Sequence, residues 1–383
     1  MIPLSVPNIK GNEWKYVKEC LDTEWVSSAG KFVDLFEKKM EQFTGSKYAV
    51  ACVNGTSALQ VSLKLAGVEE GDEVIVPSLT FIAPVNAIRY NNAFPIFMDS
   101  DDYYNINVEK TIQFLIKETK FINGKTINSS TRRKISAIVP VHIWGNACNL
   151  SDLVELCKKR NIKIVEDASE SLGTYFKENM LKGKHTGRIG LLGCISFNGN
   201  KIMTTGGGGM ILTDDENLFE KAKYLTTQAK DDPVRYIHNE VGFNFRLTNI
   251  QSALGVAQLE QLPKFLKHKK FIYEYYKKNI EQIKGLKIAS EPTYSNNNHW
   301  INLIQIDSNV YGEDREQLMQ RLSIEKVQTR PVWALNHEQE PYKTFQAYQI
   351  ENAKKLVKNS LCIPSSSNLS NDEMAKVVDL LSG

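Results

Sequence analysis

Lys201 is the residue whose setting first suggests covalent chemistry. It follows a short apolar run and the polar turn Asn198-Gly199-Asn200, and an amine in such a turn can form an imine with a carbonyl compound. A solvated surface lysine is the alternative, and the usual fate of this residue type. The glycines at 206–209 lack the spacing of the phosphate-binding motifs G-x-x-x-x-G-K-S/T and G-x-G-x-x-G. We therefore expect them to pack as backbone close to Lys201.

Acidic residues come directly after another predicted strand. Asp167 follows the strand expected over 163–166, and Glu170 comes three residues later. Folds of the α/β class bind ligands at the carboxyl ends of strands, which is where Asp167 falls. An aspartate there can keep a pyridine nitrogen protonated, and a protonated pyridine ring is the electron sink of pyridoxal-phosphate (PLP) chemistry. A helix-capping acid is an equally open alternative.

Two further segments contain candidate binding residues. Asn54-Gly55-Thr56-Ser57 follows the predicted strand 48–53 and opens a helix, so its free N–H groups could bind a phosphate or simply be capped. Asn244 and Arg246 stand one residue apart, and their side chains point the same way if the segment is extended. A loop with a chance arginine is the alternative for this second segment.

Short apolar strands alternate with amphipathic helices from about residue 47 to residue 226. This alternation predicts a mostly parallel sheet covered by helices on both faces, with a polar excursion or hairpin at 117–134. Long helices are then expected over 253–262 and 265–280, followed by strands at 300–306 and 327–332 and helices at 314–322 and 372–381. We place a domain boundary near Leu262, which gives a large domain of residues 1–262 and a small domain of residues 263–383.

Composition excludes several classes of protein. The 383 residues carry a formal net charge of +3 without a long basic block, so no nucleic-acid partner is expected. The six cysteines form no C-x-x-C pair, the N-terminus has no signal-peptide pattern, and no apolar run approaches the ~20 residues of a membrane helix. The six histidines show no ligand spacing, so no metal is expected, and no G-x-S-x-G hydrolase motif occurs. We expect a cytoplasmic protein with reduced thiols.

In order along the chain, these segments resemble the DegT/DnrJ/EryC1 family of PLP-dependent sugar aminotransferases. The resemblance extends over nearly the whole chain and rests on an ordered set of short motifs. That set is Trp25-Val26-Ser27-Ser28-Ala29-Gly30, Asn54 to Leu59, Pro77 to Phe81, Pro140 to Asn146, Glu166-Asp167-Ala168, Ser196 to Gly209, Gly242 to Leu247, Thr329-Arg330-Pro331 and Leu361 to Ser366.

The resemblance implies the type I, aspartate-aminotransferase-like fold, with a large domain around a mostly parallel sheet and a smaller C-terminal α/β domain. It also implies a homodimer with active sites shared between subunits. Lys201 matches the lysine that binds PLP covalently and acts in catalysis. The implied cofactor-binding residues are Gly55, Thr56, Ser57, Phe81, Asp167, Glu170, Ser196 and Asn244. The implied substrate-binding residues are Arg246, Arg330 and His238.

The implied reaction moves an amino group from glutamate to C4 of a nucleotide-linked 4-keto-6-deoxy sugar, in bacterial surface-glycan biosynthesis. Within the family, Asn198-Gly199-Asn200-Lys201 looks most like the subgroup that acts on UDP-linked N-acetylated sugars, which includes the bacillosamine and legionaminic acid pathways. Glu170 departs from the glutamine that many relatives carry, and a glutamate donates a hydrogen bond only when it is protonated.

Several alternatives remain open at this stage. A sugar dehydratase, an amino-acid aminotransferase and a non-catalytic regulatory homologue could all share this fold. One dehydratase branch of the family replaces the lysine by histidine, so Lys201 favours transamination. A Rossmann oxidoreductase is disfavoured because a proper G-x-G-x-x-G motif is missing.

Overall fold

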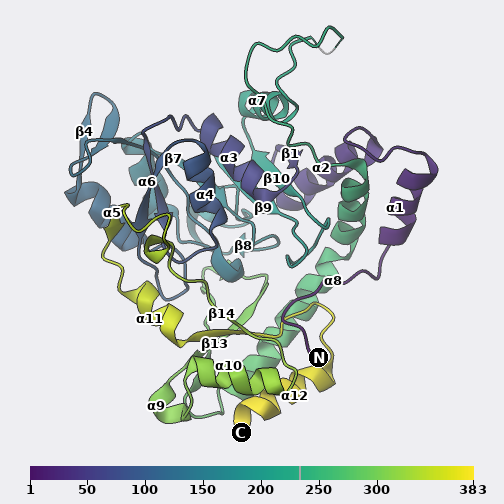
Figure 1. Cartoon of the computed structure of the whole chain (residues 1–383), viewed down its shortest axis with the longest axis vertical. Coiled ribbons are helices and arrows are strands. Elements are labelled where there is room, and N and C mark those ends of the chain that lie inside the picture. The colour runs from purple at the N-terminus through teal and green to yellow at the C-terminus, as the bar shows by residue number, and fades with distance from the viewer. Residues whose placement is uncertain (233) are drawn as a thin grey trace.

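A ten-stranded mixed sheet forms the centre of the larger part of the molecule (Figure 1). The computed structural model describes residues 1–232 and 234–383. The strand order is β1-β10-β9-β7-β6-β2-β3-β15, and the β4–β5 hairpin attaches to β6. The strands from β9 to β15 in this order run parallel, whereas β10 runs antiparallel to β1 and β9. Their bounds are β1 Tyr48–Cys52, β2 Glu73–Pro77, β3 Phe94–Met98, β4 Thr119–Ile122, β5 Lys125–Asn128, β6 Lys134–Ile138, β7 Lys163–Asp167, β9 Leu192–Ser196, β10 Gly209–Thr213 and β15 Ala347–Tyr348.

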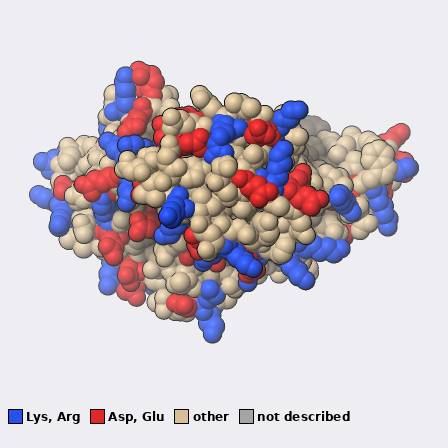
Figure 2. All heavy atoms as spheres, turned by 90° about the horizontal axis from the view of Figure 1, so that it is seen from below, with Lys and Arg blue, Asp and Glu red and all other residues tan. Residues whose placement is uncertain are grey.

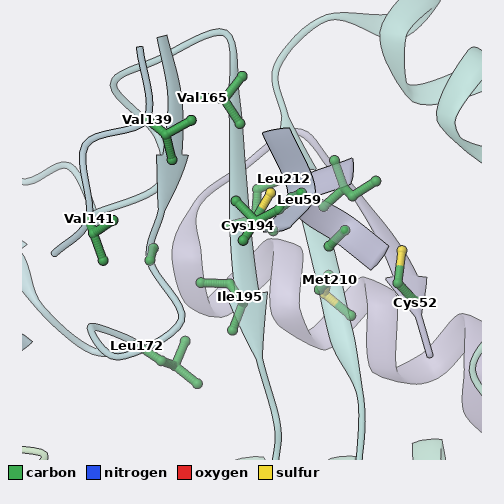
Figure 3. Packing of buried hydrophobic residues seen from close by; sticks show 14 of the residues in the cluster. Cys52, Leu59, Val139, Val141, Val165, Leu172, Cys194, Ile195, Met210 and Leu212 are labelled. Atoms are coloured by element: carbon green, nitrogen blue, oxygen red, sulfur yellow. The ribbon is translucent and has the colours of Figure 1, made fainter. Parts of the chain in front are cut away.

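Alternate side chains of the parallel strands β2, β3 and β7 enter two different cores, because side chains of a strand point to opposite faces of the sheet. Val165 of β7, for example, packs in one core and its neighbour Ile164 in the other. Figure 3 shows part of the first core, where Leu59 of a helix lies against Cys194 and Leu212 of two strands. The predicted mostly parallel sheet with helices on both faces is confirmed.

Helices α3 and α4 cover the first face of the sheet, and α5 and α6 cover the second. Helix α7 packs against α3 and β1, and the N-terminal helices α1 and α2 pack against α8. The bounds are α1 Glu13–Asp22, α2 Lys31–Thr44, α3 Gly55–Leu65, α4 Ala83–Tyr90, α5 Val108–Lys117, α6 Ser151–Lys159, α7 Glu216–Thr226 and α8 Asn249–Ile280, with short 3-10 turns at Ile143–Gly145, Asn179–Leu181 and Asn336–Glu338.

A second, smaller antiparallel sheet of order β11-β13-β16-β14 builds the C-terminal core together with α10, α12 and the end of α8. A further two-stranded sheet joins β8 to β12. The bounds are β8 Tyr175–Phe176, β11 Leu286–Ile288, β12 Ser295–Asn296, β13 Asn302–Ile306, β14 Arg330–Pro331, β16 Ser360–Ile363, α9 Ser308–Tyr311, α10 Arg315–Ile324, α11 Asn352–Asn359 and α12 Asn371–Ser382.

Helix α8 corrects the prediction of two separate helices at 253–262 and 265–280. It is continuous from Asn249 to Ile280 with Pro263 inside it, and it runs from α1 and α2 to α12 (Figure 1). Packing along its length outweighs the hydrogen bond that a proline removes. The boundary placed at Leu262 falls within this helix, and β15 returns to the large sheet. The division into two domains therefore stays a prediction.

Strand β6 ends at Ile138, shortly before Pro140, which has no N–H for a regular ladder. The polar segment 117–134 contains the hairpin of β4 and β5. Across the described residues, no helix combines the length and the apolar character that crossing a membrane requires. On the face shown in Figure 2, lysine and arginine lie among aspartate and glutamate.

Candidate active site

The candidate residues gather at one edge of the large sheet. Strands β1, β2, β7 and β9 all end at this edge, since β1 and β9 are both antiparallel to β10 and the others run parallel to β9. Asn54 follows β1, Phe81 follows β2, Asp167 ends β7 and Ser196 ends β9. Carboxyl ends of strands are where open α/β sheets bind ligands, so the sheet itself brings these residues to one place.

The N-terminus of α3 forms a cradle with free N–H groups. The Asn54 side chain accepts a hydrogen bond from the Ser57 amide at 2.8 Å, and the Asn54 carbonyl accepts from Ala58. The amides of Gly55 and Thr56 have no acceptor among the described residues. Together with the helix dipole, such amides bind an anion.

Gly55 leaves space in this cradle. A Cβ at Gly55 would lie 2.9 Å from Cβ of Ser196 and 3.3 Å from Oγ of Ser169. A Cβ at Gly209 would lie 2.4 Å from the backbone of Asn54. Glycine backbone therefore packs closely at the start of α3, beside the hydroxyls of Ser169 and Ser196, whereas the packing of residues 206–209 beside Lys201 stays a prediction.

Lys201 lies in the turn after β9, with its amine facing the carboxylate of Glu170. Nζ of Lys201 lies 3.4 Å from Oε1 of Glu170, and the Lys201 side chain is only 12% exposed. The other carboxylate oxygen of Glu170 accepts a hydrogen bond from the Trp144 amide at 2.9 Å. Lys201 is therefore not the solvated surface lysine that the alternative interpretation required.

Asp167 is a buried carboxylate without an ion-pair partner among the described residues. Its Oδ1 accepts a hydrogen bond from the Ser169 amide at 3.0 Å. Burial raises the pKa of Asp167, and the Ser169 hydrogen bonds and the charge of Lys201 partly oppose this rise. Burial also raises the pKa of Glu170, and Lys201 and the Trp144 amide oppose it. A cationic group bound beside Asp167 would stabilise its charged form.

Three tryptophans stack beside Lys201. Trp144 lies between Trp300, at 5.7 Å between ring centroids, and Trp333, at 4.1 Å. Nζ of Lys201 lies 4.1 Å from the centroid of the Trp300 ring. Phe81 is 53% exposed and lies 6.2 Å from Trp333, so it extends this aromatic wall outward.

Trp144 has a backbone conformation that non-glycine residues seldom adopt. Its φ is +57°, in the left-handed region, which costs roughly 1–2 kcal/mol for a residue with a Cβ. The hydrogen bond of its amide to Glu170 and the two stacking contacts hold it there. Strain of this kind persists where the surroundings determine the conformation, and it is frequent at functional sites.

Four other predicted residues have no contact with Lys201 in this chain. Arg246 donates to Oδ1 of Asn244 at 3.1 Å and to Gln228, and Asn244 itself is exposed. The ring of His238 contacts the carbonyls of Gln228 and Ala229 in an exposed loop. Arg330 is exposed on β14 of the small sheet. Their roles stay predictions, as do those of the residues at the sheet edge.

The site fits the cofactor expected from the sequence. The cradle at α3 has amides without an acceptor among the described residues and hydroxyls for a phosphate, the buried Asp167 forms no ion pair among those residues, and Lys201 presents a shielded amine beside Glu170. A phosphate, a pyridine nitrogen and an aldehyde are the three groups of PLP that these features match.

Comparison with known proteins decides the family. Residues 7–382 match the model of the DegT/DnrJ/EryC1/StrS aminotransferase family. The chain belongs to this family. As a DegT/DnrJ/EryC1/StrS member it is a PLP-dependent aminotransferase with the type I fold, as the sequence predicted.

Named relatives match over the full length of this family member. It is 36% identical to a GDP-perosamine synthase of Escherichia coli O157:H7, covering 99% of this chain and 97% of the relative. It is 33% identical to a GDP-perosamine synthase of Caulobacter vibrioides, again covering 99% and 97%. The solved structure of DesI in the presence of its TDP-sugar product superimposes with a TM-score of 0.88 at 25% identity, covering 100% of this chain and 92% of that one.

Sequence reasoning assigned no role to Trp300, Trp333 or Asn298. Asn298 donates from Nδ2 to the carbonyls of Glu170, at 2.8 Å, and of Leu172. All three lie far along the chain from Lys201. Residue type offered a signal only for the two tryptophans, since the chain has five tryptophans and buried ones are large anchors, and no signal pointed to Asn298.

Proposed function

We propose that this aminotransferase moves the amino group of glutamate to the keto carbon of a 4-keto-6-deoxy sugar linked to a nucleotide. The reaction would make it a sugar aminotransferase of nucleotide-sugar biosynthesis. The observation that carries the proposal is the shielded amine of Lys201, 3.4 Å from Glu170, in the turn that follows β9, whose last residue Ser196 borders the cradle of α3. The names of the relatives and of the DesI structure support a sugar nucleotide as the acceptor.

The identity of the nucleotide is a finer part of the proposal. The sequence motif favoured a UDP-linked N-acetylated sugar, whereas the relatives are named for a GDP sugar and the DesI structure for a TDP sugar. GDP-, UDP- and TDP-linked 4-keto-6-deoxy sugars are therefore all candidate acceptors. The GDP form is the first to test, because the relatives of highest identity given above carry its name.

Each side chain of the site has a chemical task in this proposal. When bound, PLP supplies an aldehyde that joins an amine covalently and a protonated ring that withdraws electrons. Nζ of Lys201 would take the proton from the donor carbon, as a base, and return it, as an acid, to the cofactor carbon on the other side of the transferred nitrogen. Oδ of Asp167 holds the proton on the pyridine nitrogen, and the amides of Gly55 and Thr56 bind the phosphate. The tryptophan wall excludes water from the reacting atoms.

The choice between transamination and dehydration depends on Lys201. A dehydratase of the same fold would remove a hydroxyl from the sugar, and the branch of the family with that outcome lacks the lysine. Lys201 and its contact with Glu170 therefore favour transfer of an amino group.

The test uses glutamate labelled with ¹⁵N and a panel of GDP-, UDP- and TDP-linked 4-keto-6-deoxy sugars. We expect mass spectrometry to find ¹⁵N in the sugar product of at least one acceptor. Borohydride should fix PLP to the single peptide that contains Lys201. Lys201→Ala, the matched control, should lose nearly all turnover while remaining folded. A product that has lost a hydroxyl and contains no ¹⁵N, or fixation of PLP to another lysine, contradicts the proposal.

A further inference from the structure

Lys269 is a buried lysine that the proposed reaction does not use. It lies in α8 and is 2% exposed. Its Nζ donates to the carbonyl of Trp300 at 2.7 Å and to the carbonyl of Ser365, and it forms no ion pair with a carboxylate of the described residues. Burial lowers its pKa to about 7. An amine without a carboxylate is costly to bury, so its two carbonyl contacts need an explanation.

The two carbonyls lie at the same end of the small sheet. Trp300 precedes β13 and Ser365 follows β16, and these strands pair with Asn302 opposite Ile363. Oγ of Ser365 also accepts a hydrogen bond from the Asn302 amide at 2.9 Å. Lys269 therefore ties α8 to both chain segments at the end of the small sheet.

Trp300 in turn contacts Lys201 in two ways. Its indole Nε1–H donates to the carbonyl of Asn200 at 2.7 Å, which is the peptide directly before Lys201. Its ring centroid lies 4.1 Å from Nζ of Lys201. A shift of the Trp300 backbone would therefore move both the turn that carries Lys201 and the surface that covers its amine.

We propose that Lys269 is a positioning residue for Lys201, acting through the backbone and ring of Trp300. The inference rests on the proposed role of Lys201 and adds a residue that acts on Lys201 indirectly. A lysine suits the task because the amine has two N–H groups even when neutral, so both carbonyls keep a donor whichever form is present. An apolar residue would leave two buried carbonyls without a partner, and the Trp300 segment would have to move to satisfy them.

Lys269→Met tests the link, because it keeps an unbranched side chain of similar length and removes the donor. Tyr276→Phe is the matched control. Tyr276 lies seven residues further along α8, on the same face of the helix, is fully buried, and donates to the carbonyl of Pro364 at 3.0 Å. Both variants remove a buried hydrogen bond from α8 to the end of β16. Only Lys269→Met also removes the hydrogen bond to the Trp300 carbonyl.

The readout is the rate at which an acylating reagent labels Lys201 in the cofactor-free protein, measured by peptide mass spectrometry against exposed lysines. We expect Lys269→Met to raise this rate roughly two- to fivefold, the range that corresponds to losing one contact between an ammonium and an aromatic ring. Tyr276→Phe should lose thermal stability and keep the wild-type labelling rate. The loaded Lys269→Met enzyme should show a lower kcat and a shifted visible absorption of the bound cofactor.

Equal labelling of Lys201 in wild type and Lys269→Met, or an equal rise in both variants, would overturn the inference. If Lys269→Met does not fold, Trp300→Phe isolates the second step, since it removes the indole N–H and keeps an aromatic ring. Unchanged labelling of Lys201 in that variant overturns the inference as well. Labelling needs neither cofactor nor turnover, so its result is separate from the ¹⁵N test of the proposed function.

Discussion

At the scale of single residues, burial distinguishes the acids of this site from ordinary surface acids. Asp167 is 4% exposed and Glu170 is 5% exposed, and burial raises the pKa of each. The surroundings differ, since Glu170 forms an ion pair with Lys201, whereas Asp167 forms none among the described residues. This difference makes Asp167 the acid whose charge a protonated pyridine nitrogen would stabilise.

Asp167→Asn should therefore bind PLP and lose activity. The amide keeps the shape of the side chain and removes the negative charge that stabilises the ring proton. We expect a fall in kcat of roughly two orders of magnitude or more, the usual loss when a key electrostatic group is removed. Steady-state kinetics and cofactor content measure the two effects separately. Near-normal turnover with full cofactor content would show that Asp167 does not have this role.

At the scale of elements, the start of α3 depends on how closely it approaches β9 and β10. Gly55 faces Ser196 and Gly209 packs on Asn54, so the amides of α3 reach the sheet edge only because two residues lack a Cβ. The Asn54 cap holds the same turn from the other side. The cradle is thus a product of helix capping and of close packing between elements.

Gly55→Ala should weaken cofactor binding while the protein stays folded. The new Cβ would lie 2.9 Å from Cβ of Ser196, which cannot move away without displacing the end of β9. We expect the Kd for PLP to rise about tenfold or more, a change of about 1.4 kcal/mol. Gly207→Ala is the control, because the nearest atom to its Cβ is 3.8 Å away. Absorbance titration with PLP measures the Kd of both variants. Equal affinities would exclude a phosphate cradle at Gly55.

At the scale of the whole molecule, the homodimer stays a prediction, and it would explain why Asn244 and Arg246 lie apart from Lys201. Arg246 donates hydrogen bonds to Asn244 and to Gln228, and neither Asn244 nor Arg246 contacts Lys201. Large apolar side chains are exposed at Trp25, Val241 and Phe81. Contacts with a second copy would bury such residues and could bring Asn244 to the partner's cradle.

Mixing Lys201→Ala chains with Asn244→Ala chains tests the shared site. If Asn244 completes the partner's phosphate site, each heterodimer has one active site with both lesions and one with neither. We expect activity to reappear on subunit exchange and to approach a quarter of wild type when two inactive pools mix evenly, since half of the dimers then carry one intact site of two. Verified exchange without any return of activity, or an active protein that sediments as a monomer, refutes sharing.

Local chemistry in the sequence determined much of this protein. Strand alternation predicted the mostly parallel sheet, the segment Asn54 to Ser57 predicted the start of a helix, and Asp167 and Lys201 were predicted at strand ends, because each signal depends on a few neighbouring residues. Tertiary structure alone decided the rest. Trp300 meets the Asn200 carbonyl across 100 positions, and the acceptors of Lys269 are backbone carbonyls, which carry no sequence signal. The continuity of α8 past Pro263 likewise comes from packing, which outweighs the local preference of proline.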